Sequence, residues 1–107
     1  MRWFEKIINA HTDVTHDVSH YERMKSERYF VWQEDGAGDG VKAESRHDEK
    51  TTTGTTDLFT KTEFDPWAEE IEASFSNHGI AWHRNSVQYE DETGFIHYEW
   101  VWEVVDG

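Results

Sequence analysis

Histidine and carboxylate side chains are the groups in this sequence that could carry chemistry. The chain of 107 residues contains seven histidines, 23 aspartates and glutamates, and no cysteine. Without cysteine, a thiol nucleophile, a thiolate metal site and a disulfide framework are all excluded. Any catalysis or metal binding would therefore depend on histidines and carboxylates whose spacing brings them together.

Two histidines have the spacing of a metal-binding helix. His16 and His20 are four residues apart, with Asp17 between them and with His11 and Asp13 close by. On a helix, both imidazoles would share one face, as in the H-E-x-x-H motif of zinc proteases. However, the shorter aspartate would hold its carboxylate further from a metal-bound water, no apolar stripe surrounds the pair, and no third ligand is marked. We therefore expect surface histidines without a metal, and a small zinc hydrolase is the least favoured hypothesis.

Other candidate ligand sites have simpler explanations. Residues 90–92 are acidic, but they lack the alternating spacing and the distal glutamate of an EF-hand loop. Residues 35–40 are rich in glycine, yet this predicted loop precedes a strand and carries two aspartates that would repel phosphate. His83 and His97 could face each other across a hairpin as a polar pair. We therefore predict no enzyme, no cofactor, and no catalytic, cofactor-binding or metal-binding residue.

The charge of the chain limits its partners. The formal net charge is −13 at pH 7, and such a protein is repelled by phosphate backbones and by anionic membranes. We expect no nucleic-acid binding and no membrane association. No apolar run is long enough for a signal peptide or a membrane span, so we expect a soluble protein that stays in a cytoplasm or is assembled there. The acids could form a solvated surface, meet a basic partner, or mimic DNA.

The best-marked element is a helix over residues 66–78. Asp65 is a good N-cap, Pro66 occupies the first helical position, and Gly79 is placed to end the helix. One apolar stripe runs along it, formed by Trp67, Ile71 and Phe75.

A hairpin over residues 80–105 follows this helix. Even positions from Ile96 to Val104 are apolar, which predicts a strand with one buried face. The apolar parity changes between Trp82 and Val87, so we predict a bulge near residues 85–86. A turn is predicted over residues 91–94.

The first half of the chain is less clearly patterned. Apolar residues of one face predict a helix over residues 2–10, and residues 11–27 could be either helical or a short extended segment. Strands are predicted over residues 28–34, 41–47 and 50–61. Because the third of these strands is rich in threonine, we expect much of it at a sheet edge or facing solvent. Its Gly54 predicts a bulge or a close approach of another backbone.

Together these elements predict one α+β domain over residues 1–107. The order is α-β-β-β-α-β-β, with two helices and a mostly antiparallel, twisted sheet of four to five strands. Aromatic residues make up 15% of the chain, enough for a core. Most tryptophans should lie in that core, and any exposed on the sheet would be natural contacts for a partner. The candidate partner-contact residues are Trp32, Trp82, Trp100 and Trp102.

Several short segments resemble a known family. Residues 28–36 (RYFVWQEDG) are similar to the "PPYLVYxEEG" strand, and residues 57–62 (DLFTKT) to the "xELYT" strand, of small phage tail-completion proteins. Residues 78–80 (HGI) resemble the "NGI" that ends the family's acidic helix, and residues 98–104 (YEWVWEV) resemble its closing "YEFEV" strand. These tail-completion, or head–tail joining, proteins are encoded by long-tailed phages and prophages of Gram-positive bacteria.

The resemblance implies a structural protein of the virion. Such proteins form rings, often hexamers, at the junction of tail tube and head, and they do no chemistry. It implies a homo-oligomeric ring built by heterologous contacts, with tail-tube or head-connector proteins as partners. An acidic subunit would be steered towards a more basic partner. The alternative hypothesis is an acidic inhibitor that mimics DNA and binds a basic host protein.

Overall fold

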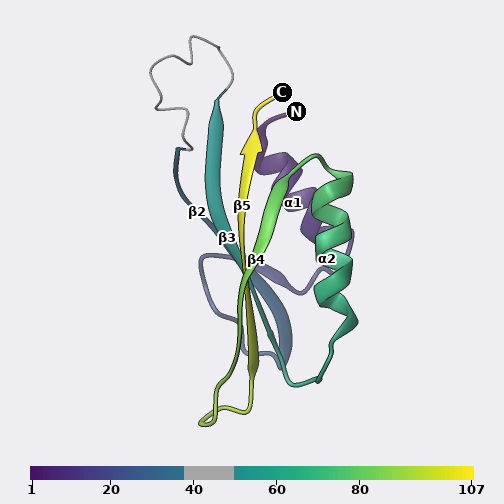
Figure 1. Ribbon diagram of the computed structural model, residues 1–107, viewed down its shortest axis with the longest axis vertical. Coiled ribbons are helices and arrows are strands. Elements are labelled where there is room, and N and C mark those ends of the chain that lie inside the picture. The colour runs from purple at the N-terminus through teal and green to yellow at the C-terminus, as the bar shows by residue number, and fades with distance from the viewer. Residues whose placement is uncertain (38–49) are drawn as a thin grey trace.

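Within residues 1–37 and 50–107, which the computed structural model describes, five strands form one sheet and two helices cover one of its faces (Figure 1). The elements, in chain order, are α1 (Trp3–Thr12), β1 (Val18–His20), β2 (Arg28–Ala37), β3 (Thr51–Thr60), α2 (Pro66–Asn77), β4 (Ala81–Tyr89) and β5 (Ile96–Val105). The predicted α+β class and the order α-β-β-β-α-β-β are confirmed.

The sheet has the strand order β1-β2-β3-β5-β4. β1 runs parallel to β2, whereas β2–β3, β3–β5 and β5–β4 are antiparallel pairs. The sheet is therefore mostly antiparallel, as predicted. Among the described strands, β1 and β4 lie at the two edges and β3 lies at the centre.

The central position of β3 corrects the prediction that this threonine-rich strand lies at an edge or faces solvent. Thr56 and Thr60 are completely buried. The indole N–H of Trp102 donates to the Thr56 hydroxyl over 2.9 Å, and the Thr60 hydroxyl donates to Asp65 over 2.7 Å. Threonine suits a central strand here because its branched carbon fits the pleat while its hydroxyl bonds inside the core.

Gly54 marks the closest packing in the centre of the sheet. It lies directly opposite Trp102 in the β3–β5 pair. A Cβ added at this position would collide with the Trp102 ring and with the carbonyl oxygen of Gln33 on β2. The predicted close approach of another backbone is confirmed, and the large indole fills the space that glycine leaves.

The ambiguous stretch after the first helix is resolved into two elements. α1 ends at Thr12, two residues later than predicted, and β1 pairs with β2 from Val18 to His20. The extended alternative for this stretch is therefore correct for its middle. So short a strand has little sequence pattern of its own, and its pairing with β2 positions it.

The predicted loop over residues 35–40 begins too early. β2 continues through Ala37, with a register shift between Glu34 and Gly36 that leaves Asp35 as a bulge. The bulge is held by the Thr53 hydroxyl, which donates to the Asp35 carboxylate over 2.7 Å. The predicted strand over residues 41–47, and the remainder of the loop, lie outside the described residues.

The second half of the chain matches its predictions closely. The Asp65 carboxylate caps α2 by accepting from the Trp67 N–H, and Gly79 follows the helix with a φ of 73°. The β4–β5 register shifts between Arg84 and Ser86, which confirms the predicted bulge. None of the helices in residues 1–37 and 50–107 is long and apolar enough to cross a membrane.

The core lies between the sheet and the helices. Ile7 and Ala10 of α1 and Ile71 and Phe75 of α2 meet strand residues of the helix-covered face, the largest of which are Trp100 and Trp102. The other face of the sheet carries a second, smaller cluster of Tyr29, Val31 and Phe59, with Met24 and Phe95 packed against it.

Candidate functional site

The two histidines with metal-ligand spacing do not share a helix. His16 is exposed in the bend before β1, and His20 lies in β1 itself. The His20 ring stacks on Trp32, with 3.8 Å between centroids, and its Nε2 donates to Glu34 over 2.8 Å. Across residues 1–37 and 50–107, no three histidine or carboxylate groups converge on a common point.

His11 has a structural role that the sequence interpretation missed. Its ring is completely buried in the core. Nδ1–H donates to the carbonyl of Ile7 over 2.7 Å, so Nε2 accepts from the Thr56 hydroxyl over 3.0 Å, and Thr56 in turn accepts from Trp102. Burial lowers the pKa of His11 to about 4, against the opposing effect of the Ile7 hydrogen bond. The sequence could have indicated this buried position, because His11 follows Ile7 by four residues and so lies on the same apolar face of α1.

His97 lies on the face of the sheet that the helices leave open. Its Nε2 donates to Asp57 over 3.0 Å, its Nδ1 lies 3.5 Å from Glu90, and its ring stacks on Phe59. The Asp57 hydrogen bond raises the pKa of His97 more than burial lowers it, and the negative charges of Asp57 and Glu90 add to the rise. The site is a local ion-pair cluster.

The predicted pairing of His83 with His97 is wrong. His83 lies opposite Val101, and Gln88 lies opposite His97. The turn between β4 and β5 lies too far along the chain for such a pairing, since Tyr89 is the residue that pairs with Ile96.

The four candidate partner-contact tryptophans divide into two groups. Trp100 and Trp102 are buried in the core, and Trp32 is almost as buried beneath His20. Trp82 is only half-buried on the edge strand β4, and its indole N–H donates to the Ser76 hydroxyl over 2.9 Å. A partner contact through Trp82 stays a prediction, whereas the other three side chains belong to the core.

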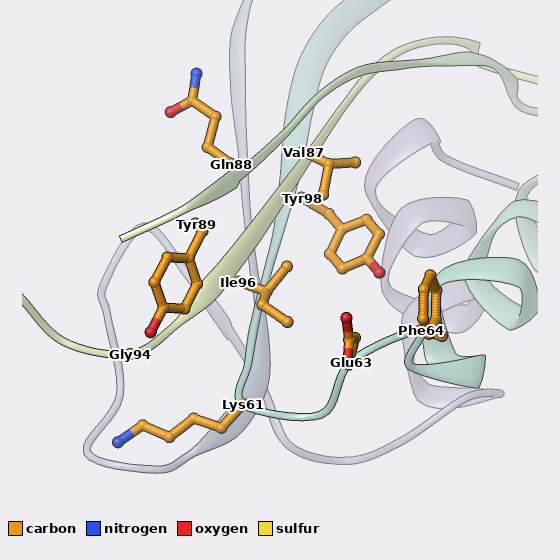
Figure 2. Close-up of a pocket in the computed structure, with 9 residues that line it drawn as sticks. All are labelled: Lys61, Glu63, Phe64, Val87, Gln88, Tyr89, Gly94, Ile96 and Tyr98. Atoms are coloured by element: carbon orange, nitrogen blue, oxygen red, sulfur yellow. The ribbon is translucent and has the colours of Figure 1, made fainter. Parts of the chain in front are cut away.

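A groove of about 630 Å³, lined by both apolar and polar side chains, lies between the β4–β5 hairpin and the segment that precedes α2 (Figure 2). We call it the β4-edge groove. Phe64, Val87, Tyr89 and Ile96 are its main apolar walls, and Glu63 and Lys61 also line it. Phe64, Val87 and Tyr89 are 85%, 48% and 65% exposed, which makes this the most exposed group of large apolar side chains near one groove. The sequence did not reveal this exposed group, because the positions of Val87 and Tyr89 predict only the apolar face of a strand and not whether that face is covered.

The lip of the β4-edge groove is anchored by Asp65. This buried carboxylate is bonded by the Arg28 guanidinium, the Thr60 hydroxyl and the backbone N–H of Trp67. Burial raises the pKa of Asp65, but these hydrogen bonds outweigh it, so the pKa lies below its ordinary value. The ionised Asp65 therefore fixes the position of its neighbour Phe64.

A second groove, of about 460 Å³, lies beside the free edge of β1. We call it the β1-edge groove. It is bordered by Trp3, Phe4, Ile8 and Trp32, with His20 and Glu34 at its rim. Tyr21 closes this rim, because its ring stacks on His20 with 3.8 Å between centroids and its hydroxyl donates to Glu34 over 2.8 Å.

Comparison with known proteins gives no relative: no family model matches the chain, and no curated protein matches it.

Proposed function

We propose that this chain is a structural protein of a phage or prophage virion, which completes the tail at the head–tail junction as part of a ring. It would be made in the cytoplasm of a bacterial host and then built into the particle. On this proposal it performs no catalysis and needs no cofactor. Its partners would be further copies of itself and a tail-tube or head-connector protein.

The observation that carries this proposal is where the family-like segments lie. Residues 28–36 and 98–104 lie in β2 and β5, and residues 57–60 of the third segment form the end of β3, so the three strands are consecutive neighbours in the sheet. Residues 78–80 follow α2 directly, on the covered face of the same sheet. Segments that are scattered along the sequence thus form one continuous structural unit, which favours a family resemblance over chance likeness of single strands.

The two grooves add support, because a joint must present different surfaces to different neighbours. A ring closes through heterologous contacts, in which one surface of a subunit meets a different surface of the next. The β1-edge and β4-edge grooves lie at opposite edges of one sheet, on the side that carries the helices. The chain therefore offers distinct apolar surfaces on two sides.

The test is the location of the protein in purified particles. Tailed particles should contain this chain at the head–tail junction, visible by labelling with an antibody in electron micrographs. Deleting its gene should leave heads and tails unjoined, and the gene supplied in trans should restore joining. Complete particles that lack the protein would refute the proposal.

The oligomeric state is a separate test of how the ring forms. With a net charge of −13, isolated subunits repel one another, so we expect the free protein to be a monomer that assembles only on its partner. Gel filtration at rising concentration should show a single monomeric peak. A stable hexamer at low micromolar concentration would show that no template is needed.

A DNA-mimicking inhibitor is the second candidate, and the net charge is the observation that favours it. This candidate requires the chain to displace duplex DNA from a basic host protein. Competition measured with a fluorescent duplex and a host nuclease would reveal such displacement. No displacement, together with incorporation into particles, would eliminate it.

A further inference from the structure

Phe64 has a left-handed backbone conformation in the turn before α2, although its side chain is exposed. Its φ is 57°, in the left-handed region that costs a non-glycine residue about 1–2 kcal/mol. Its side chain is 85% exposed, so almost no burial offsets this cost. Figure 2 shows Phe64 and Tyr89 at opposite ends of the β4-edge groove, with the Glu63 carboxylate between them. An exposed aromatic ring held under strain beside a groove is suited to contact with a partner.

Within residues 1–37 and 50–107, no strand pairs with the outer side of β4. The Glu90 N–H donates to the carbonyl of Phe95 over 2.8 Å, and Tyr89 lies opposite Ile96. Because hydrogen-bonded and non-hydrogen-bonded pairs alternate in an antiparallel ladder, the N–H and C=O groups of Val87 and Tyr89 point away from β5, towards the free edge.

Only this half of the β4 edge is regular. The bulge between Arg84 and Ser86 interrupts the other half, and bulges are a common protection against unwanted strand pairing. The unprotected half is the one whose side chains Val87 and Tyr89 border the groove. An added strand could therefore use its backbone on β4 and its side chains in the groove at the same time.

The charges around the groove select a basic occupant. Glu63 lines the groove, and Asp91 and Glu92 are exposed in the turn after β4. Lys61 also lines the groove, but its ammonium lies 3.6 Å from Glu27 and over the Phe95 ring. The faces of exposed aromatic rings also attract a cation. A second copy of this chain, with the same net charge of −13, is a poor match for such a surface.

We propose that the β4-edge groove binds an extended, basic segment of a partner protein, which pairs as a strand with Val87–Tyr89 and places an arginine or lysine between Phe64 and Tyr89, against Glu63. This inference goes beyond the proposed function and does not depend on it, because it rests on the strand edge, the groove and the charge of this chain alone.

The proposal is tested with the full chain and a synthetic peptide. The probe is an acetylated and amidated peptide of alternating arginine and valine, six residues long, and the control is the same peptide with glutamate in place of arginine. Titration followed by ¹H–¹⁵N NMR should give saturable shifts at Phe64 and Val87–Tyr89 with the basic peptide only. Binding should weaken as salt is added.

Two matched substitutions separate binding from folding. Phe64→Asn puts a residue that tolerates the left-handed conformation at the groove, so the fold should persist while affinity for the basic peptide falls about tenfold. Tyr21→Asn makes the same change at the other exposed aromatic of positive φ, beside β1, and should leave affinity unchanged. Glu63→Gln should lower affinity severalfold and reduce its dependence on salt.

Other results would overturn the proposal. These are the absence of saturable shifts, equal shifts with the glutamate peptide, shifts spread over the whole acidic surface or centred on the β1 edge, or undiminished affinity in Phe64→Asn. Shifts at Val87–Tyr89 that grow with protein concentration alone would assign the groove to a second copy of the chain instead.

Discussion

The two edges of the sheet carry the same unusual feature and use it differently. Beside β1, Tyr21 is an exposed aromatic residue with a φ of 76°, and beside β4, Phe64 is an exposed aromatic residue with a φ of 57°. Tyr21 is bonded to Glu34 and stacked on His20, so its ring completes the β1 edge. Phe64 instead projects beside an open groove (Figure 2).

The two edges therefore differ in how far the chain itself engages this side chain, which is 54% exposed in Tyr21 and 85% exposed in Phe64. An uncovered strand edge is a template for pairing with another chain, and proteins usually protect it. At the β1 edge, Tyr21 stacks on His20, and His20 stacks on Trp32. The apolar half of β4 has no equivalent among the described contacts, so we interpret it as the side that meets a partner.

The largest expected effect comes from removing the Asp65 carboxylate, which joins the start of α2 to β2 and β3. Asp65→Ala should lower the free energy of unfolding by about 3–5 kcal/mol, because it removes the N-cap of α2 and leaves the Arg28 and Thr60 donors without their acceptor. Asp65→Asn can still cap the helix and should cost less. Urea denaturation measures both. A loss below about 1 kcal/mol for the alanine variant would mean that Asp65 does not anchor the groove lip.

The second-largest effect is expected from a substitution at the centre of the sheet, and it should reach both edge strands. Gly54→Ala places a methyl group against Trp102, so we expect a loss of about 2–3 kcal/mol. Thr55→Ala, at the next position of β3, is the control and should cost less than about 1 kcal/mol. Hydrogen exchange should then accelerate in both β1 and β4. Acceleration at one edge only would show that β3 does not couple the two edges.

Acidification should weaken the core beside the β1 edge. The pKa of His11 is about 4 in the folded state, below the ordinary value of 6.5. Between these two pH values, His11 is protonated in the unfolded state but neutral in the folded state. Stability should be lost as the pH falls through this window, by about 1 kcal/mol from about pH 7 to about pH 5.5. NMR should show the His11 ring neutral, with its proton on Nδ1, throughout that range.

His97 supplies the control for this pH dependence because its pKa is shifted in the other direction. Its contribution is complete below the ordinary value of 6.5 and is lost as the pH rises through its higher folded-state pKa. In His97→Gln this opposing contribution is absent, so acidification should weaken the variant more than the parent protein. A His11 ring that titrates near pH 6.5 would contradict the buried network.

The smallest effect is the most direct test of the comparison between edges. Phe64→Asn should raise the free energy of unfolding by about 0.5 kcal/mol, since it relieves left-handed strain without removing a buried contact. Tyr21→Asn relieves the same strain but removes the hydroxyl bond to Glu34 and the stack on His20, so it should lower the free energy of unfolding instead. Equal effects at the two positions would mean that the two edges do not differ.

The sequence by itself determined the elements whose signals are local. Asp65, Pro66 and Gly79 mark the ends of α2, and the alternation from Ile96 to Val104 defines β5, because caps and strand periodicity depend only on residues near in the chain. The bulge in β4 was also legible from its change of apolar parity. Together these fixed the α+β class and the order of elements.

The tertiary structure alone decided what depends on distant partners. The threonine-rich β3 can lie at the centre because the Thr56 hydroxyl bonds with both His11 and Trp102, which lie 45 and 46 residues away in the sequence. The β4-edge groove forms only where the segment before α2 meets the β4–β5 hairpin. The residues next to a side chain in the sequence give no information about such distant contacts. The polar strand β3 was therefore predicted to lie at an edge, and the edge position of β4 was not predicted.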